Sequence, residues 1–294
     1  MSVIRGVPPS ARWTRIAERV VLAILFGGML IWLYLIAGDW NFGDINAYWL
    51  AAMRLREGAL LYPTHLNPDS YEVFRYAPWF AWIWVPLTYL PRTLVDWGWA
   101  AILGLASGAI LVAVVRLRTP AAWAFAFIIT PWLLSLVQVG NIQPLVVAAL
   151  AFGISRRSGP IWLAIAGSLK AVPLVFALVY VARRQWLRLA LTLAITIVLL
   201  APFLLYDLSG YQTDPGRSVS FYYYVSPLAW AATAAAALLA ATVLAIRRSP
   251  FVWAASAVAV MLLAPRTHVT YATYLVVAIL NGGHDPLLGR VRNR

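Results

Sequence analysis

The chain has 294 residues, of which 63% are hydrophobic and only 11% charged, and its formal net charge is +13. A soluble domain carries about 25% charged residues, so this composition excludes a soluble globular protein. The basic residues stand in short clusters between apolar runs, which excludes a nucleic-acid-binding surface, where they would gather on one face. The sequence has no cysteine, so disulfides and thiolate chemistry are excluded as well. We therefore expect an integral membrane protein surrounded by lipids.

Clusters of arginine predict where the chain crosses the membrane. Short cytoplasmic loops are enriched in Lys and Arg, so each cluster marks the cytoplasmic end of a span. An even number of crossings must then separate consecutive clusters, and both termini are predicted to be cytoplasmic. The clusters are Arg5/Arg12/Arg15/Arg19, Arg116/Arg118, Arg156/Arg157, Arg183/Arg184/Arg188, Arg247/Arg248 and Arg290/Arg292/Arg294.

Apolar segments fill the intervals between these clusters. In chain order, alternately outward and inward, they are Val20–Ile36, Val95–Val115, Ala121–Val137, Ile142–Ile154, Ile161–Leu169, Val172–Ala182, Leu187–Tyr206, Pro227–Ile246, Phe251–Ala264 and Val269–Leu280. The first is interpreted as a retained signal anchor, because it is longer than a usual signal-peptide core and no clean cleavage site follows. We predict an all-α, polytopic transmembrane helix bundle of about eight to eleven membrane segments, folded as one domain over residues 1–294.

Two of these segments are too short to cross a membrane. At 1.5 Å per residue, Ile142–Ile154 covers about 20 Å of a hydrocarbon core roughly 30 Å thick, and Ile161–Leu169 covers less. The chain is broken beside them, at Gly140–Pro144 and at Ser168–Pro173. Broken backbone at this depth must line a protein-walled or hydrated cavity, because lipid cannot pair with its polar groups. By parity both breaks lie on the outer side, although one long span over Ile161–Ala182 is an alternative.

The polar stretch 39–94 is predicted to be an outer loop that carries juxtamembrane helices. Within it, Ile45–Arg56 has the pattern of a helix on the membrane surface, with Asp44 as its N-cap and Gly58 as the residue that stops it. Ala77–Leu90 is apolar and rich in tryptophan but too short for a full span. We expect it to form a second juxtamembrane helix or a re-entrant helix.

Polar residues at the predicted outer surface are the candidates for chemistry. The sequence has no P-loop, no glycine-rich dinucleotide turn and no Asp-x-Asp pair, and its three histidines are scattered, so neither a nucleotide nor a metal site is indicated. Asp44 is either a plain helix-capping carboxylate or a general base that faces a cavity. Lys170 is the only lysine and lies between two apolar segments, where an ionisable residue indicates function. The other candidates, for which snorkelling, capping or an interfacial position is the ordinary alternative, are Arg75, Tyr76, Asn141, Gln143, Arg266 and His268.

These groups suit the transfer of a sugar from a lipid-linked phosphate. An isoprenyl phosphate is a good leaving group, so a single carboxylate that deprotonates the acceptor hydroxyl suffices for in-line attack with inversion. Glycosidases differ, because they need two carboxylates. Cations near the leaving phosphate stabilise its developing charge, and Lys170, Arg75 and Arg266 are the candidates for this role.

Four short motifs follow one another along the chain. They are Gly43-Asp44-Ile45-Asn46-Ala47-Tyr48, Phe74-Arg75-Tyr76-Ala77-Pro78, Gly140-Asn141-Ile142-Gln143 and Leu169-Lys170-Ala171-Val172-Pro173. Together they resemble glycosyltransferase family 87, the polyprenol-phosphate-mannose-dependent α-mannosyltransferases of the GT-C superfamily. The resemblance extends over roughly residues 43–188 and includes most of the candidate residues.

The resemblance implies an inverting transfer of a sugar, mannose before others, that needs neither a metal nor a cofactor. Asp44 would be the catalytic base, and His268 would pair with it as a proton relay. Contacts to the donor phosphate and the substrate would come from Arg75, Tyr76, Asn141, Gln143, Lys170 and Arg266. The donor would be a polyprenyl-phosphate-linked sugar, and the acceptor a lipid or glycan on the outer face of the plasma membrane.

The second half of the chain is shorter than the resemblance leads us to expect. The loop Asp207–Ser226 is much shorter than an acceptor-side region, which indicates another acceptor, a partner in a membrane complex, or lost activity. Two other functions remain open. One is a non-catalytic accessory subunit that keeps the GT-C scaffold. The other, a transporter or flippase, is disfavoured because the sequence has no internal repeat.

Overall fold

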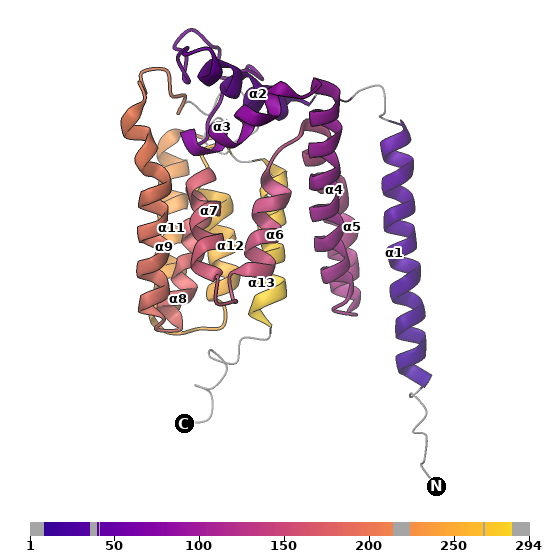
Figure 1. Ribbon diagram of the computed structural model, residues 1–294. Helices are drawn as coiled ribbons and strands as arrows, with labels where there is room; N and C mark the ends of the chain where they lie inside the picture. The colour runs from indigo at the N-terminus through magenta and orange to yellow at the C-terminus, as the bar shows by residue number, and fades with distance from the viewer. Residues whose placement is uncertain (1–8, 36–39, 41, 214–223, 267, 284–294) are drawn as a thin grey trace.

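The computed structural model describes residues 9–35, 40, 42–213, 224–266 and 268–283 of the chain. Every regular element in this part is a helix and no strand occurs within it, so the predicted all-α fold is confirmed. The long helices lie side by side in one bundle, with two short helices across one end (Figure 1). Part of the predicted topology lies outside the described residues, namely Arg5, Ile36, residues 214–223 of the shortened loop, Arg290, Arg292 and Arg294.

The helices coincide with the expected membrane segments. Each segment falls on one α-helix or on a 3-10 helix together with the α-helix beside it, and the boundaries differ by a few residues. In chain order the elements are α1 (Pro9–Leu35), α2 (Gly43–Arg56), α3 (Pro78–Trp84), η1 (Val85–Tyr89), α4 (Arg92–Val115), α5 (Pro120–Val139), α6 (Gln143–Gly153), α7 (Gly159–Leu169), η2 (Val172–Ala177), α8 (Leu178–Ala182), α9 (Trp186–Leu200), η3 (Ala201–Leu205), α11 (Pro227–Ile246), α12 (Val252–Leu263), η4 (Val269–Tyr274) and α13 (Leu275–Gly282).

The starts of α5 and α11 show how the sequence begins a membrane helix. Each has a hydroxyl residue at its N-cap and proline at the first helical position, Thr119–Pro120 and Ser226–Pro227. The Thr119 hydroxyl accepts a hydrogen bond from the backbone N–H of Ala122 (3.2 Å), and Ser226 caps α11 in the same way. Proline is tolerated there because its missing N–H would have no helical partner. The apolar run that follows then continues the helix.

Only some of the helices are long enough to cross a membrane. By length and composition, these are α4, α5, α9 continued by η3, and α11 among the described residues. The other apolar stretches are shorter, and they are Gln143–Gly153, Gly159–Leu169, Val172–Ala182, Val252–Leu263 and Val269–Gly282. The two segments that the sequence marks as too short are both among them. The prediction of a polytopic helical bundle with short and broken segments is therefore confirmed.

The chain reverses at Lys170, which settles the one alternative topology. α7 ends at Leu169, Lys170 is extended (φ −142°, ψ 106°), and η2 begins at Val172. α7 and η2 pack against each other, with Gly167 so close to the Leu174 side chain that a Cβ would lie 2.4 Å from it. A single long span over residues 161–182 is therefore wrong, because the break and the small residue beside it let the two short segments fold back on each other.

The two ends of the bundle carry different elements. α1 begins and α13 ends at one end, whereas α2 and α3 lie across the opposite end (Figure 1). The breaks that precede α6 and follow α7 lie at the same end as α2 and α3. This arrangement agrees with the crossings counted from the arginine clusters. Which end faces the cytoplasm stays a prediction.

The helix α2 begins two residues earlier than expected. It starts at Gly43 after Phe42, which has a left-handed backbone (φ 42°) and forms the N-cap without a side-chain hydrogen bond. The prediction that Asp44 is the N-cap is therefore wrong: Asp44 lies inside the first turn, and its side chain is directed to another helix break. The predicted end is confirmed, because α2 ends at Arg56 and Gly58 (φ +69°) follows its C-cap.

The tryptophan-rich segment forms the short helix α3, which continues directly into the 3-10 helix η1 and lies beside α2. α3 and η1 together occupy residues 78–89, and neither is among the helices long enough to cross a membrane. Both contact α2, and Phe80 and Trp84 of α3 are buried against Tyr48 of α2. The expectation of a short helix in this segment is therefore confirmed, and whether it lies beside the membrane or re-enters it stays a prediction.

At Gly140 both the backbone conformation and the packing disfavour a side chain. Gly140 ends α5 with φ +76°, and a Cβ there would lie 2.1 Å from Ile45 Cγ1 in α2. We expect Gly140→Ala to destabilise the folded protein by about 1–3 kcal/mol, the usual cost of a non-glycine residue in this region. The apparent melting temperature in detergent should fall. Gly98→Ala is the control, because Gly98 is helical and open space surrounds its Cβ position; equal melting of both variants would contradict the prediction.

Candidate active site

Asp44 is held from a helix break that lies 97 residues further along the chain. Asn141, in the break between α5 and α6, donates a hydrogen bond from Nδ2 to Asp44 Oδ2 (2.5 Å). Asn141 Oδ1 in turn accepts the backbone N–H of Gln143 (2.9 Å), which begins α6. The Asp44 carboxylate and the Asn141 amide are thereby held in a fixed position relative to the start of α6. In the described part of the chain, Asp44 Oδ1 takes no hydrogen bond.

Lys170 reaches the same place from the α7–η2 break. Its Nζ donates to Asn141 Oδ1 (3.2 Å) and to Gln143 Oε1 (3.2 Å), and it lies 5.4 Å from the centre of the Tyr271 ring. Gln143 is 1% exposed, and its Nε2 donates to the Thr270 carbonyl (2.8 Å) and to the Thr273 hydroxyl (3.0 Å). We call Asp44, Asn141, Gln143 and Lys170 the Asp44 cluster. It joins α2 to the α5–α6 break and the α7–η2 break, and Gln143 links it to η4.

Two arginines complete a positively charged rim. Arg75 Nη2 and Arg266 Nη1 both donate to the Pro68 carbonyl, the latter at 3.3 Å, and Arg266 also pairs with Asp69 (3.3 Å). Arg75 Nε is buried and has no hydrogen-bond partner in the described part of the chain. Both guanidinium groups act electrostatically on Asp44. The rim therefore carries more positive charge than its own carboxylates balance.

Tyr48, Tyr62 and Tyr76 form a hydrogen-bonded network beside this rim. Tyr48, one helical turn after Asp44, donates from its hydroxyl to Tyr76 (3.1 Å) and accepts the backbone N–H of Ile142 (3.3 Å). The Tyr62 hydroxyl donates to the Tyr76 carbonyl (2.8 Å). Burial, and then the Asp44 charge, raise the pKa of Tyr76, so its phenol stays neutral. Tyr76, predicted as a substrate contact, thus lies within the site and is held by protein partners.

Burial shifts the pKa values of Asp44 and Lys170 in opposite directions. Burial raises the pKa of the Asp44 carboxyl, while the Asn141 hydrogen bond and then the charges of Lys170, Arg266 and Arg75 oppose that rise. Burial lowers the pKa of Lys170 to about 8, and the Asp44 charge opposes that fall. A carboxylate with raised basicity beside a cation that titrates near neutrality is an arrangement typical of catalytic sites.

His268 is placed at the edge of the site and not in the Asp44 cluster. It precedes η4, and its side chain is largely exposed. Partial burial, and then the nearby charges of Arg266 and Lys170, lower its pKa, so it is neutral at physiological pH. The described residues show no hydrogen bond between His268 and Asp44. The relay between these two side chains stays a prediction.

Sequence reasoning brought together the charged residues but missed their supports. Tyr48, Thr270, Thr273 and Tyr271 all contact the Asp44 cluster or its partners. For Tyr48 a signal existed, because it lies four residues after Asp44 and so on the same helical face. For the η4 residues there was none, since only the folded bundle brings them against α6.

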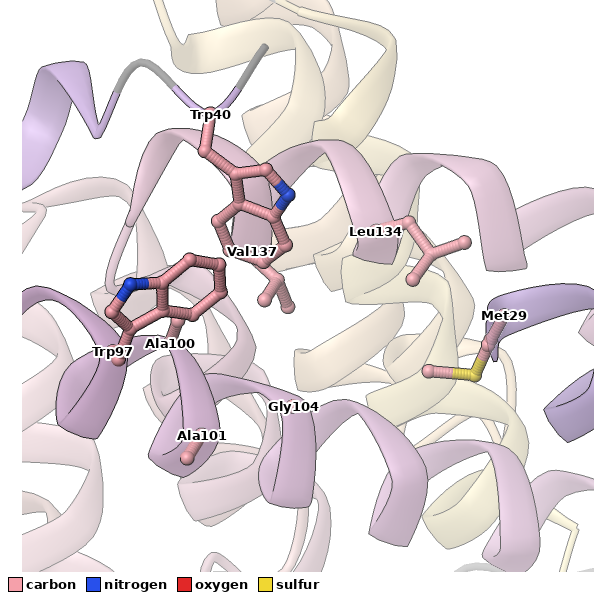
Figure 2. A pocket seen from close by; sticks show the side chains of 8 residues that line it. All are labelled: Met29, Trp40, Trp97, Ala100, Ala101, Gly104, Leu134 and Val137. Atoms are coloured by element: carbon pink, nitrogen blue, oxygen red, sulfur yellow. The ribbon is translucent and has the colours of Figure 1, made fainter. Parts of the chain in front are cut away.

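An apolar cavity of about 260 Å³ is lined by Trp40 and by residues of α1, α4 and α5, none of which belongs to the Asp44 cluster (Figure 2). It opens between α1 and the helices α4 and α5, which are the helices that α1 contacts among the described elements. Trp40 and Trp97 stand at one side of it and contact Phe42, with ring centres 5.2 Å apart in a tilted pair and 5.5 Å apart in an edge-to-face pair. Its lining is Met29, Trp40, Trp97, Ala100, Ala101, Gly104, Leu134 and Val137. This cavity has no acid or base and offers no chemistry of its own, but it suits a hydrocarbon chain.

The sequence profile of glycosyltransferase family 87 matches residues 74–223, a little over half of the chain. The chain belongs to glycosyltransferase family 87. The matched part contains Arg75, Tyr76, Asn141, Gln143 and Lys170, and Asp44 precedes it. Three of the four residues of the Asp44 cluster therefore lie in the part of the chain that matches the family, and the structure brings Asp44 into contact with one of them.

A curated relative has a printed function. It is the polyprenol-phosphate-mannose-dependent alpha-(1-2)-phosphatidylinositol pentamannoside mannosyltransferase of Mycolicibacterium smegmatis (strain ATCC 700084 / mc(2)155), 28% identical over 204 residues. The alignment covers 64% of this chain and 49% of the relative, so the chain spans about half the length of the curated protein it matches. No solved structure matches the chain.

Proposed function

We propose that this family 87 protein transfers a sugar, mannose before others, from a polyprenyl phosphate to a hydroxyl of a glycolipid or glycan. The observation that carries the proposal is the Asp44 cluster, where one carboxylate and one ammonium are held at the same end of the bundle, beside Arg75 and Arg266. The name of the curated relative supports mannose as the sugar and a glycolipid as the acceptor. By the crossings counted from the arginine clusters, the site faces the outer side of the plasma membrane.

The chemical step follows from the placement of the charges. Asp44 takes the proton of the acceptor hydroxyl as the acceptor oxygen bonds to the anomeric carbon of the sugar. The bond from that carbon to the phosphate oxygen breaks at the same time, and polyprenyl phosphate leaves with the electron pair. Lys170, Arg266 and the unpaired Nε–H of Arg75 stabilise the phosphate charge. Attack opposite the leaving group inverts the anomeric configuration, and the protein supplies all of these groups from its own side chains.

The apolar cavity supports a lipid acceptor. In-line displacement places the acceptor and the phosphate on opposite sides of the sugar. The cations come from the α7–η2 break, from the residues before η4 and from Arg75 before α3, whereas the cavity is lined by Trp40 and by residues of α1, α4 and α5. We therefore assign the cavity to an aliphatic chain of the acceptor and not to the polyprenyl chain of the donor.

The proposed function is tested with the full chain in lipid nanodiscs. It is supplied with labelled polyprenyl-phosphate mannose and with glycolipid acceptors, and the product is analysed by mass and by NMR of its anomeric carbon. We expect a mannosylated lipid whose anomeric configuration is opposite to that of the donor. No transfer to any acceptor, together with co-purification in a larger complex, would favour an accessory subunit. Substrate movement into vesicles without transfer would favour a transporter.

Gly104→Phe tests the assignment of the cavity. Open space surrounds the Cβ position of Gly104, so the ring can enter the cavity without a backbone clash. Each buried CH₂ contributes about 0.8 kcal/mol, so excluding two of them should raise the KM for a long-chain acceptor about tenfold. The KM for a short-chain acceptor analogue and for the donor should stay unchanged.

Gly98→Phe is the matched control for this substitution. Gly98 is also in α4 and also has open space at its Cβ position, but it does not line the cavity. A rise in the KM for the polyprenyl donor, in place of the acceptor, would show that the cavity holds the donor chain and that our assignment is wrong. Unchanged KM values for both lipids would show that neither chain enters.

A further inference from the structure

The side-chain amides of Asn141 and Gln143 are occupied by the protein itself. Both lone pairs of Asn141 Oδ1 are used, one by Lys170 and one by the Gln143 backbone, and Nδ2 donates to Asp44. Gln143 Oε1 accepts from Lys170, and both Nε2 hydrogens are taken by Thr270 and Thr273. Among the described residues, one Nδ2 hydrogen of Asn141 and one lone pair of Gln143 Oε1 have no partner, and every other hydrogen-bonding position of the two amides is used. Their geometry therefore favours holding protein groups in place over binding a substrate.

The orientation of the Asn141 amide is determined by the charges on either side of it. A carboxylate only accepts and an ammonium only donates, so the N–H must face Asp44 and the oxygen must face Lys170. Rotating the amide by half a turn would place oxygen against carboxylate and N–H against ammonium. The amide dipole is thus aligned between a negative and a positive group that do not form a direct ion pair in the described structure.

We propose that Asn141 and Gln143 are positioning residues whose neutral amides keep the Asp44 carboxylate and the Lys170 ammonium apart, each with one face free for a substrate. This inference rests on the proposed function and assigns to the two amides a role different from the donor contact that the family resemblance implied. Asp44 keeps Oδ1 for the acceptor hydroxyl. Lys170 keeps its third N–H for the donor phosphate, because two are directed to amide oxygens.

Keeping Asp44 and Lys170 apart changes the chemistry of both groups. A direct Asp–Lys pair would favour both charged forms, making the carboxylate a weaker base and satisfying the ammonium internally. An amide between them transmits hydrogen bonds to both groups without neutralising either. Other charges also face the pair: Arg75 and Arg266 act on Asp44, and Asp44 acts on Lys170. The phenols that face it are Tyr48, Tyr76 and Tyr271, and His268 lies beside Lys170.

Gln143 anchors this arrangement to the last part of the bundle. Its amide bonds Lys170 on one side and Thr270 and Thr273 of η4 on the other. The distance between the α7–η2 break and η4 is thereby fixed. Because Gln143 is almost fully buried, the anchor is not open to solvent exchange. The position of the ammonium is thereby set by the protein and not by the substrate.

The test uses the fact that Lys170 is the only lysine of the chain. Protein labelled with 13Cε-lysine gives one lysine NMR signal, and its titration midpoint is expected near pH 8 in the wild-type full chain. Gln143→Glu places a carboxylate against the ammonium without changing the side-chain shape, so we expect the midpoint to rise by about one to three pH units. Asn141→Asp should raise it as well, and should also move the acid limb of the pH–activity profile upward, because two carboxylates would then adjoin.

Thr273→Val is the matched control for the lost bonds of Gln143→Glu, since it removes one of them without adding charge. Its lysine midpoint should stay at the wild-type value. The inference is overturned if both charge variants fold and leave the midpoint unchanged, or if their main effect is a higher KM for the polyprenyl donor. Failure of the wild-type protein to transfer any sugar would defeat the proposed function instead, and the lysine titration would still report on the amide bridge.

Discussion

Asp44→Asn is expected to lower kcat for sugar transfer by about 10²–10⁴-fold, the contribution of a positioned general base. Asparagine keeps the size of the side chain but accepts no proton from the acceptor hydroxyl. It also cannot keep the charge that orients the Asn141 amide. The KM for the polyprenyl donor should change less than kcat, because the cations that bind the phosphate remain. The measurement is steady-state transfer by the purified protein, with folding checked by its melting temperature.

Glu57→Gln is the control for this loss of charge. Glu57 is the C-cap of α2 and is exposed, so the substitution removes one carboxylate from the end of that helix without touching the site. We expect its activity to equal that of the wild type. If Asp44→Asn turned over sugar at the wild-type rate, Asp44 would not be the base and the mechanism would have to be abandoned.

Lys170→Met is expected to lower kcat by about 10²–10³-fold, the usual effect of removing one group that stabilises developing charge. Methionine is of similar length and apolar, so the neighbouring segments can still pack. Lys170→Arg restores a cation and should recover part of the activity. Arg116→Met is the control for the lost charge, because Arg116 is exposed at the far end of α4. Equal losses in Lys170→Met and Arg116→Met would mean that the charge acts through stability alone.

The pH dependence of transfer should separate these two residues. As the pH falls through the raised pKa of Asp44, the carboxyl is protonated and the base is lost, so the acid limb should lie above the ordinary aspartate range. As the pH rises through about 8, Lys170 loses its proton and the phosphate loses a counter-charge. In Lys170→Arg the alkaline limb should disappear, because a guanidinium stays charged. An alkaline limb that persists in this variant belongs to another group.

The helices were predictable because apolar runs and arginine clusters are local signals. Residues 142–154 and 161–169 were recognised as too short from rise per residue alone, and the reversal at Lys170 confirms that reasoning. The start of α2 was predicted wrongly, since Asp44 has the residue type of an N-cap. Phe42 takes the left-handed conformation there, packed against Trp40 and Trp97, and frees the carboxylate to face Asn141. Tertiary packing decided the cap.

The site was predictable in its charged members and not in its geometry. Lys170 was predicted because an ionisable residue between apolar segments is costly, and Asp44 and Arg75 because they are charged residues of the polar outer stretch; the three do converge. That an amide would stand between carboxylate and ammonium depends on where two helix breaks meet, which no spacing along the chain reveals. The η4 hydroxyl and carbonyl that bind Gln143 lie more than a hundred residues away from it.

The two helix breaks and η4 also determine the order in which the site is assembled. A chain is made and inserted from its N-terminus, so α2 and the break at Asn141 are in place while η4 is still unmade. Arg266, Thr270 and Thr273 are then supplied by the last helices, which lock Gln143 and through it Lys170. Gln143, and through it Lys170, therefore takes its final position only after η4 has joined the bundle. A chain that stops before Arg266 would hold the Asp44–Asn141 contact without the η4 anchor.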